Sequence, residues 1–305
     1  MIKAKKINVL VDSWNLTGCE EQWNRVKTAG GTDIDLIEDL FSKYPISTIL
    51  LADDKKLVEI IECVKNDANL KVIIPSSKDE PKTHLYNILY DIFVTHGFEE
   101  MDKHQFSLDS ERRVCPYCNR NYVGTIDEKR LYIPLDHFYP KSIYPFLGAS
   151  VNNLFPCCPT CNSGLKGNKD TFIEGVVHPC SINSDTSIFS FEIKSLSFKD
   201  ILPPEDSFEI RIDNYENNSD LFEWEKIFNK YHKDEVVDLI VKKRCYLNPL
   251  YIENLENLLQ GIEGIDKDDI KRYVLGGYYN PIDHHKKPLS KLIYDIVKQL
   301  GIDSN

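Results

Sequence analysis

The 305-residue sequence lacks an apolar run long enough to cross a membrane, and it has less positive than negative charge. A bilayer span needs about 20 consecutive, mostly apolar residues, so a membrane-spanning protein is not expected. Lysine and arginine number 37 against 48 aspartates and glutamates, which gives a formal net charge of −11. That charge argues against a protein that coats nucleic acid by bulk electrostatic attraction.

Internal repeats, low-complexity tracts and a clear flexible linker are also lacking. The N-terminus has basic residues and a short apolar run, but this run ends at Asp12 without a small-residue cleavage site. We therefore predict no signal peptide and a cytoplasmic protein. We expect the outer parts of the chain to pack around a central module.

Three regions with different patterning predict an α+β protein. Residues 1–110 mix short apolar runs with helical spacing and predict an N-terminal α/β region of unknown role. Residues 111–180 are dense in proline, cysteine and asparagine and form the central module. Residues 181–305 predict strands followed by a mostly helical C-terminal region.

The individual elements follow from the same patterns. Strands are predicted at 7–11, 48–52, 71–74, 187–193 and 207–212. Helices are predicted at 33–43, 54–65, 83–96, 220–247, 251–259 and 288–300. Gly97 is expected to end the helix that precedes it, since glycine often follows the last helical residue.

Nine cysteines are spread unevenly along the chain. Two CxxC pairs, Cys115-Pro-Tyr-Cys118 and Cys158-Pro-Thr-Cys161, are separated by 39 residues. In a cytosolic protein such pairs indicate metal more often than disulfides, and four thiolates suit a closed tetrahedral zinc site. The alternative is two unrelated pairs of buried thiols. Cys157 could replace Cys158 as a ligand, but only Cys158 forms a CxxC pair with Cys161.

Polar residues between and just after these pairs have the chemistry of a phosphodiester hydrolase. Such a reaction needs an activated water and neutralisation of charge on the phosphate. His137 is the only histidine between the two pairs, and a neutral imidazole is a natural base at cytosolic pH. The oxygen donors Asp136 and Asn162 suit Mg²⁺ or Mn²⁺ rather than zinc.

The motif around these residues resembles the HNH (ββα-metal) endonucleases that carry CxxC pairs. The resemblance rests on Cys115-Pro-Tyr-Cys118-Asn-Arg-Asn-Tyr, on Leu135-Asp-His-Phe-Tyr-Pro-Lys-Ser, and on the run from Asn153 through Cys161-Asn to Lys166-Gly. It is strong over 115–169, weaker at His178-Pro179 and in 272–300, and absent from 1–110. The most similar subgroup is bacterial and includes the Septu and retron-associated defence effectors, which often lie beside ATPase genes.

The resemblance implies a fold, a set of roles and a cellular setting. It implies a zinc-stabilised ββα-metal module, with His137 at a strand end and Asn162 at the helix start. It gives Asn153 the role of orienting His137 through loop contacts, and it makes the set His–Asn–Asn because Asn162 stands where many relatives have histidine. It also implies an anti-phage endonuclease that acts on DNA, or on RNA including tRNA, with an ATPase as a possible partner protein.

The roles of several residues, and the function itself, have alternatives in the sequence. Basic residues of the module are candidates for phosphate contacts or are ordinary solvated side chains, namely Lys141, Lys166 and Arg120. Tyr139, Tyr144 and Phe146 are candidates for stacking on single-stranded bases. The rival to an endonuclease is a catalytically silent adaptor that keeps the zinc-stabilised scaffold and binds nucleic acid or a partner ATPase.

Overall fold

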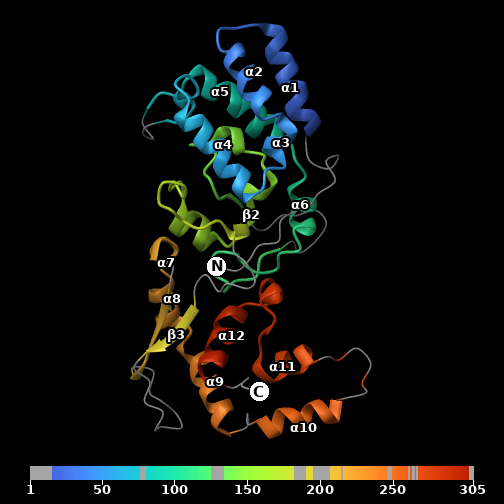
Figure 1. The fold of residues 1–305 in the computed structure, drawn as a ribbon, viewed down its shortest axis with the longest axis vertical. Helices are drawn as coiled ribbons and strands as arrows, with labels where there is room; N and C mark the ends of the chain where they lie inside the picture. Colours follow the sequence, from blue (N-terminus) through green and yellow to red (C-terminus); the bar gives the residue numbers. More distant parts are fainter. Residues whose placement is uncertain are drawn as a thin grey trace. The chain divides into compact units, whose positions relative to one another are not determined.

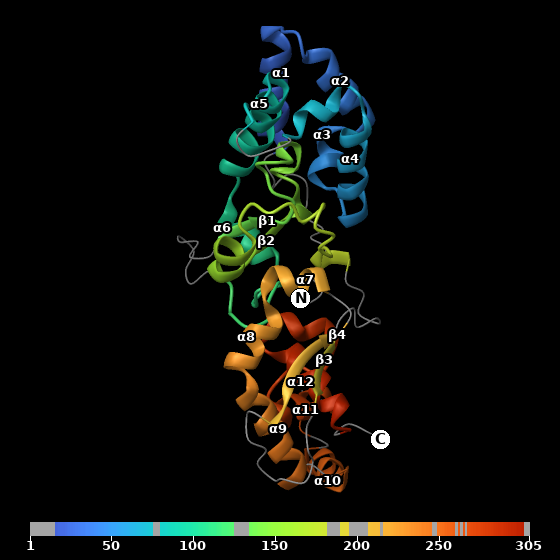
Figure 2. The same cartoon turned by 90° about the vertical axis from the view of Figure 1, so that its left-hand side faces the viewer.

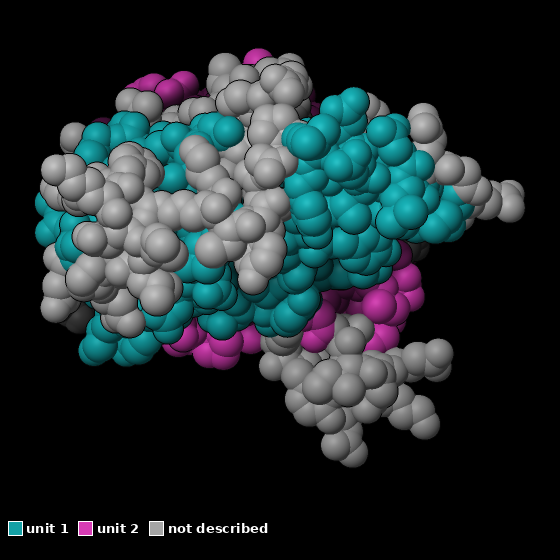
Figure 3. Space-filling model, turned by 90° about the horizontal axis from the view of Figure 1, so that it is seen from below, with its two compact units in different colours: residues 1–4, 112–123, 182–305 teal, residues 5–111, 124–181 magenta. Residues whose placement is uncertain are grey.

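The computed structural model divides the chain into two compact units (Figure 3). The N-terminal unit comprises residues 5–111 and 124–181. The C-terminal unit comprises residues 112–123 and 182–305, and residues 1–4 are grouped with it. The structure describes residues 16–75, 80–124, 134–181, 190–194, 207–213, 216–245, 249–259, 262, 265 and 267–301. The three-region division at residues 110 and 180 stays a prediction.

The described residues before the central module are helical (Figure 1). Their elements are α1 (Leu16–Ala29), α2 (Ile34–Lys43), α3 (Ile46–Leu50), α4 (Asp54–Asn66), the 3-10 helix η2 (Leu70–Ile73), α5 (His84–Tyr90), the π-helix η3 (Asp91–Glu99) and α6 (Lys103–Asp109). The predicted helices at 33–43 and 54–65 are confirmed. In α4, the Asp53 carboxylate caps the first turn by accepting from the Lys56 amide, and the apolar residues lie on one buried face.

The strands predicted at 48–52 and 71–74 are wrong, because these segments are helical. The first lies mostly in α3 and the second in η2, so the amides of Ile49 and Ile74 bond to carbonyls three or four residues earlier. Short apolar runs do not separate a buried helix from a buried strand, and local capping by Asp67 favours the helical turn here. The strand predicted at 7–11 lies outside the described residues.

The helix predicted at 83–96 is confirmed as α5 and η3, but it does not end at Gly97. The π-helix continues to Glu99. Gly97 is needed for close packing instead, since an added Cβ would lie 2.8 Å from the Ala149 Cβ and 3.0 Å from the Cys19 sulfur. Glycine therefore serves here to let η3 approach the loop of the central module.

The central module contains a short antiparallel pair of strands followed by a helix. Strand β1 (Leu135–His137) pairs with β2 (Leu154–Pro156), and His137 lies opposite Leu154. The loop between them contains the 3-10 turns η4 (Pro145–Leu147) and η5 (Val151–Asn153). The π-helix η6 (Thr160–Lys166) follows, and the turn η7 (Pro179–Ser181) ends the unit.

A small hydrophobic core lies beneath the hairpin. Phe98, Met101 and Phe106 pack with Val151 and Leu154, and Leu135 contacts the edge of this cluster. Two buried side chains attach the loop to the helices before it: the Ser150 hydroxyl donates to the Ile49 carbonyl, and the Asn152 amide donates to the Ala52 carbonyl. The helical N-terminal region therefore supplies the surface on which the central module rests.

The C-terminal unit contains a second antiparallel pair and a group of helices (Figure 2). Its elements are β3 (Ser190–Lys194), β4 (Glu209–Asp213), α7 (Glu216–Phe222), α8 (Trp224–Tyr231), α9 (Lys233–Cys245), α10 (Pro249–Leu259), α11 (Lys267–Leu275), η9 (Pro281–Lys286) and α12 (Ser290–Gln299). Strand β3 packs on α12, where the Asp295 carboxylate accepts from the Phe191 amide at 3.0 Å. The described part of the chain is mostly helical with two small sheets, which agrees broadly with an α+β protein.

The predictions for this unit are confirmed in outline. Both predicted strands are present as β3 and β4, although residues 187–189 lie outside the described part of the chain. The helices predicted at 251–259 and 288–300 correspond to α10 and α12. The single helix predicted at 220–247 is wrong, because it is divided into α7, α8 and α9. Glu223 interrupts it with a left-handed φ of 48°, and His232 ends α8. Among the described residues, no helix is both long and apolar enough to cross a lipid bilayer.

Candidate functional site

Four buried cysteines form a cluster of metal-ligand type. The sulfur atoms of Cys115, Cys118, Cys158 and Cys161 all lie within 4.8 Å of one another. A tetrahedral zinc ion with Zn–S distances of about 2.3 Å needs its sulfurs at this kind of separation, so the four thiols fit a structural zinc. No other group of three or more potential His, Cys, Asp or Glu ligands is found within the described ranges.

The choice between Cys157 and Cys158 follows from the same geometry. Cys158 belongs to the cluster, whereas Cys157 is buried outside it. The Cys157 amide donates to the Pro134 carbonyl and so continues the strand pairing, while the Cys158 carbonyl accepts from the Asn162 amide at 3.0 Å and starts the next turn. The CxxC spacing therefore singled out the cysteine whose sulfur joins the cluster.

The turn of the first CxxC pair is anchored by Asn119. This residue has a left-handed φ of 52°, and its amide donates to the Cys115 carbonyl at 2.9 Å. Its side-chain amide donates to the His284 carbonyl and its side-chain oxygen accepts from the Lys291 amide. These contacts attach the turn to η9 and α12 within the C-terminal unit.

His137 lies at the end of β1 and is almost fully buried. Its Nε2 donates to the carbonyl oxygen of Gly148 at 2.8 Å. Burial, followed by the positive charge of Lys141, lowers the pKa of His137 to about 3. The imidazole is therefore neutral at neutral pH, and because Nε2 carries the proton, Nδ1 has the free lone pair.

Asn153 holds both sides of the loop that surrounds His137. Its side-chain oxygen accepts from the Tyr139 amide at 2.8 Å, and its side-chain amide donates to the carbonyls of Tyr139 at 3.0 Å and Leu147 at 3.1 Å. Tyr139 follows His137 by two residues, and Leu147 precedes the carbonyl that accepts from the imidazole. Asn153 is fully buried, so these bonds form in a low dielectric where losing one is costly.

Asp136 and Lys166 form a buried ion pair. The Lys166 ammonium donates to Asp136 Oδ1 at 3.0 Å and to the His137 carbonyl at 2.7 Å. The side chains are 5% and 1% exposed, so Lys166 does not face solvent as a free phosphate contact would. The pair joins the last turn of η6 to the end of β1.

Asn162 occupies the third position of η6, near the helix start, and is half-buried. Its carbonyl accepts from the Gly167 amide at 2.6 Å at the other end of that helix. Asp136 and Asn162 have the oxygen donors that suit a hard divalent ion. The Asp136 carboxylate is already paired with Lys166, so an ion bound there would share it with that ammonium.

Two lysines contact the Phe98 ring, which in turn packs against His137. The Phe98 ring packs edge-on against the imidazole with a centroid distance of 4.5 Å. The Lys141 and Lys103 ammonium groups lie 4.7 and 4.8 Å from the centroid of the same ring. Burial lowers the pKa of Lys141, while Glu99 acts to raise it and Lys103 to lower it. Phe98 and Lys103 were not identified from the sequence, where they look like an ordinary core residue and an ordinary helical lysine.

The remaining basic candidate, Arg120, lies in the C-terminal unit. Its Nε donates to His232 Nε2 at 2.8 Å, and His232 Nδ1 is 3.2 Å from a Glu235 carboxylate oxygen. Arg120 is half-buried in this chain of contacts.

The aromatic residues considered as stacking platforms belong to the core. Tyr139, Tyr144 and Phe146 are all buried, so their faces are not open to a base. His178, which had no assigned role, packs edge-on against Phe138 at 4.7 Å and stacks on Tyr139, while its Nδ1 accepts from the Cys180 amide. It therefore supports the segment that directly follows His137.

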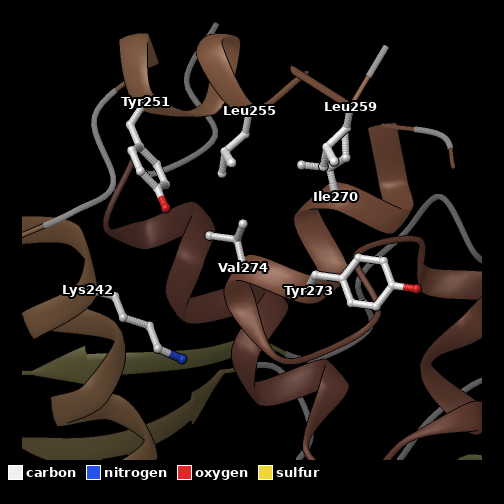
Figure 4. Close-up of a pocket in the computed structure, with 7 residues that line it drawn as sticks. All are labelled: Lys242, Tyr251, Leu255, Leu259, Ile270, Tyr273 and Val274. Atoms are coloured by element: carbon white, nitrogen blue, oxygen red, sulfur yellow. The ribbon is translucent and has the colours of Figure 1, made fainter. Parts of the chain in front are cut away.

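The C-terminal unit contains an apolar pocket of about 450 Å³ (Figure 4). Tyr251, Leu255 and Leu259 of α10 face Ile270 and Val274 of α11 across it. Lys242 of α9 and Tyr273 complete the lining, and exposed apolar side chains extend the surface at Leu250 and Leu258. Exposed apolar surface of this kind often marks a protein-interaction site.

Comparison with known proteins gives one partial similarity. No protein-family model matches the chain, and no solved structure matches it significantly. Over 94 residues the chain is 31% identical to the Septu protein PtuB of Bacillus thuringiensis. The aligned stretch covers 30% of this chain and 35% of that protein, so the chain matches only about a third of the length of this curated relative.

Proposed function

We propose that this chain is an HNH endonuclease that hydrolyses phosphodiester bonds in DNA with the help of a divalent metal ion. The observation that carries the proposal is the fixed, neutral His137 at the end of β1, with Nε2 bonded to Gly148 and Nδ1 left as a base. The four-cysteine cluster supports a zinc-stabilised ββα-metal scaffold around it. The partial similarity to the Septu protein PtuB supports a role in anti-phage defence. An ATPase partner is what the resemblance of the motif to the defence effectors implies.

In this proposal each polar residue has a distinct task. His137 Nδ1 accepts a proton from the attacking water as the new P–O bond forms, and the leaving oxygen takes a proton from solvent as its bond to phosphorus breaks. Asp136 and Asn162 would hold Mg²⁺ or Mn²⁺, which neutralises charge on the phosphate. Asn153 keeps the imidazole oriented through the loop.

In this proposal Lys141 contacts the substrate, whereas Lys166 has a structural role. Lys141 is the phosphate contact, because its ammonium is half-buried beside Phe98 and lies close enough to His137 to lower its pKa. Lys166 holds Asp136 in place rather than contacting phosphate. Arg120 stays a candidate for substrate binding only if it leaves His232.

The test is a cleavage assay on the purified chain. Plasmid DNA and total tRNA are incubated with and without Mg²⁺ or Mn²⁺, beside His137→Ala and the control His84→Ala, an exposed histidine of α5. We expect metal-dependent cleavage of DNA that is lost only in His137→Ala, with zinc content unchanged in all three proteins. Cleavage that survives in His137→Ala contradicts the catalytic role, and cleavage of tRNA alone changes the substrate to RNA.

A second candidate is a catalytically silent adaptor that binds a partner protein. The apolar pocket between α10 and α11, with exposed apolar side chains beside it, favours this alternative. An inactive wild-type chain that gains no cleavage with any metal, alone or with its partner ATPase, would make the adaptor the better proposal.

A further inference from the structure

A second cavity, of about 640 Å³, lies in the N-terminal unit and is basic. Three lysines line it: Lys65 of α4, Lys71 of η2, and Lys82, which precedes α5. The opposite wall includes Ser142 and Ile143 of the loop after β1. The cavity therefore lies between the helical region and the loop that contains the candidate catalytic site.

The three ammonium groups are not neutralised by the described protein. None of the three lysines forms an ion pair with a described residue, although the chain as a whole carries a net charge of −11. Among the described lining residues Asp170 is the one carboxylate, so three lysines outnumber it, and it accepts hydrogen bonds from the Tyr144 hydroxyl at 2.8 Å and from the Phe172 amide at 3.1 Å. Like charges gathered around a hollow repel one another, so the arrangement favours an anionic ligand.

Two of the lysines are held against aromatic rings. Lys65 lies 4.8 Å from the centroid of Phe172, and Lys82 lies 5.1 Å from the centroid of Tyr86. These contacts restrict the side chains without removing their charge. The Tyr86 hydroxyl also donates to the Ser142 carbonyl at 3.3 Å, which links the lysine-bearing side of the cavity to the loop.

The wall of the cavity and the positive charge near His137 are connected by consecutive residues of one loop. Ser142 follows Lys141 directly, and the Lys141 ammonium lies on the Phe98 ring that packs against His137. An extended strand of nucleic acid carries a phosphate every few ångströms, so a bound strand presents further phosphates beside the one at the reacting position. None of the described residues that line the cavity is aromatic, which favours a backbone phosphate over a nucleoside.

We propose that this cavity binds a backbone phosphate of the DNA strand whose scissile phosphate lies at His137. The proposal rests on the endonuclease function proposed above and adds a phosphate-binding site away from the reacting atoms. A phosphate at this position fixes where the strand lies, so Lys65, Lys71 and Lys82 set the position of the cut without contacting any base.

The experiment measures binding, so that it is independent of cleavage. A fluorescent 20-base-pair DNA duplex is titrated with the full chain at 50–300 mM salt, without added Mg²⁺ or Mn²⁺. The variant Lys71→Gln/Lys82→Gln removes two charges from the cavity. The matched control Lys230→Gln/Lys298→Gln removes two exposed lysines that lie on Tyr231 and Tyr294 in the C-terminal unit.

We expect the cavity variant to bind DNA about tenfold more weakly near 150 mM salt, and its plot of log K against log salt to be less steep by about 0.9, the value for one phosphate contact. The control should bind as the wild type does. Equal binding by the two variants, or no binding by the wild type, overturns the proposal. Failure of the proposed function is seen separately, as retained cleavage in His137→Ala.

A second arm separates the two sources of phosphate. ATP is titrated against the wild type and the cavity variant in the same buffer. ATP binding that is lost in the cavity variant, together with DNA binding that is unchanged, assigns the cavity to a free nucleotide and overturns the strand assignment. DNA binding that is weakened while ATP shows no binding supports it.

Discussion

The imidazole of His137 donates from Nε2 to the carbonyl oxygen of Gly148 at 2.8 Å. This one bond selects the tautomer and leaves Nδ1 as the only possible base. The carbonyl is itself held against the π-helix η3, because a Cβ on Gly148 would lie 2.6 Å from Val94 Cγ2 and 3.2 Å from the Phe93 carbonyl. The orientation of the candidate base therefore depends on close packing between the loop and a helix whose contacting residues precede Gly148 by 54 and 55 positions.

Gly148→Ala should lower DNA cleavage at least tenfold without loss of zinc. The new methyl group has no room beside Val94, so the loop must shift and move the carbonyl that orients His137. Initial cleavage rates and zinc content of the purified variant test this. Val94→Ala in the same chain removes one of the clashing atoms and should restore part of the rate.

Gly164→Ala is the matched control for this substitution. Gly164 lies in η6, and the nearest atom to an added Cβ is the Pro159 carbonyl oxygen at 3.9 Å. This variant should cleave as the wild type does. A cleavage rate in Gly148→Ala equal to that of the wild type would show that the loop tolerates the methyl group. It would also show that the hydrogen bond between His137 and Gly148 does not limit the reaction.

Lys166→Met should destabilise the N-terminal unit by about 3–5 kcal/mol, because it removes the ammonium group that forms an ion pair with the buried Asp136 carboxylate. Urea unfolding at neutral pH measures the loss. The double variant Asp136→Asn/Lys166→Met should lose less, since neither partner then carries an uncompensated charge. A single variant as stable as the wild type would contradict the assignment of Lys166 to a structural role.

Sequence reasoning worked best where spacing along the chain carries the chemistry. The CxxC pairs placed all four clustered cysteines, including Cys158 rather than Cys157. The resemblance to the HNH endonucleases predicted His137 at a strand end and Asn162 at a helix start, and the structure has His137 at the end of β1 and Asn162 in the first turn of η6. The sequence shows such patterns directly, because the cysteines of each CxxC pair lie on a short turn whose geometry depends on residues close by in the chain.

It worked least well where burial depends on distant partners. Lys141 and Lys166 are equivalent in the sequence, yet one is half-buried beside Phe98 and the other is enclosed with Asp136. Phe98 precedes His137 by 39 residues and has only the signal of a core aromatic. The apolar runs at 48–52 and 71–74 lie mostly in helical turns, and a short apolar run does not by itself distinguish a buried helix from a buried strand.

Cys158→Ser should release the zinc ion, whereas Cys157→Ser should keep it. Only the Cys158 sulfur lies within the four-cysteine cluster, and removing one thiolate opens a closed tetrahedral site. Because structural zinc contributes on the order of 10 kcal/mol, Cys158→Ser should also fold poorly. Metal analysis of both purified variants checks this, and full zinc content in Cys158→Ser would contradict the ligand set.

Because of His284, the free energy of unfolding of the C-terminal unit should be lower in mild acid than at neutral pH. His284 is buried, its Nε2 has no hydrogen-bond partner among the described residues, and its ring packs on Tyr294 at 5.2 Å. Burial, followed by the charges of Lys291 and His285, lowers the pKa of His284 to about 3. Between pH 6.5 and pH 3 the unfolded chain therefore binds a proton that the folded chain does not, so stability falls as pH falls.

His284→Phe keeps a ring against Tyr294 and removes this titration. At pH 7.5 the variant should be at least as stable as the wild type, because no buried ring nitrogen is left unbonded. At pH 5 its advantage should grow by about 2 kcal/mol, which is the cost of keeping a group with a folded pKa near 3 unprotonated at that pH. Urea unfolding at the two pH values measures the difference. An advantage that stays constant between them would mean that the folded unit lets His284 take up a proton, and that the ring is less enclosed than its burial and its contact with Tyr294 indicate.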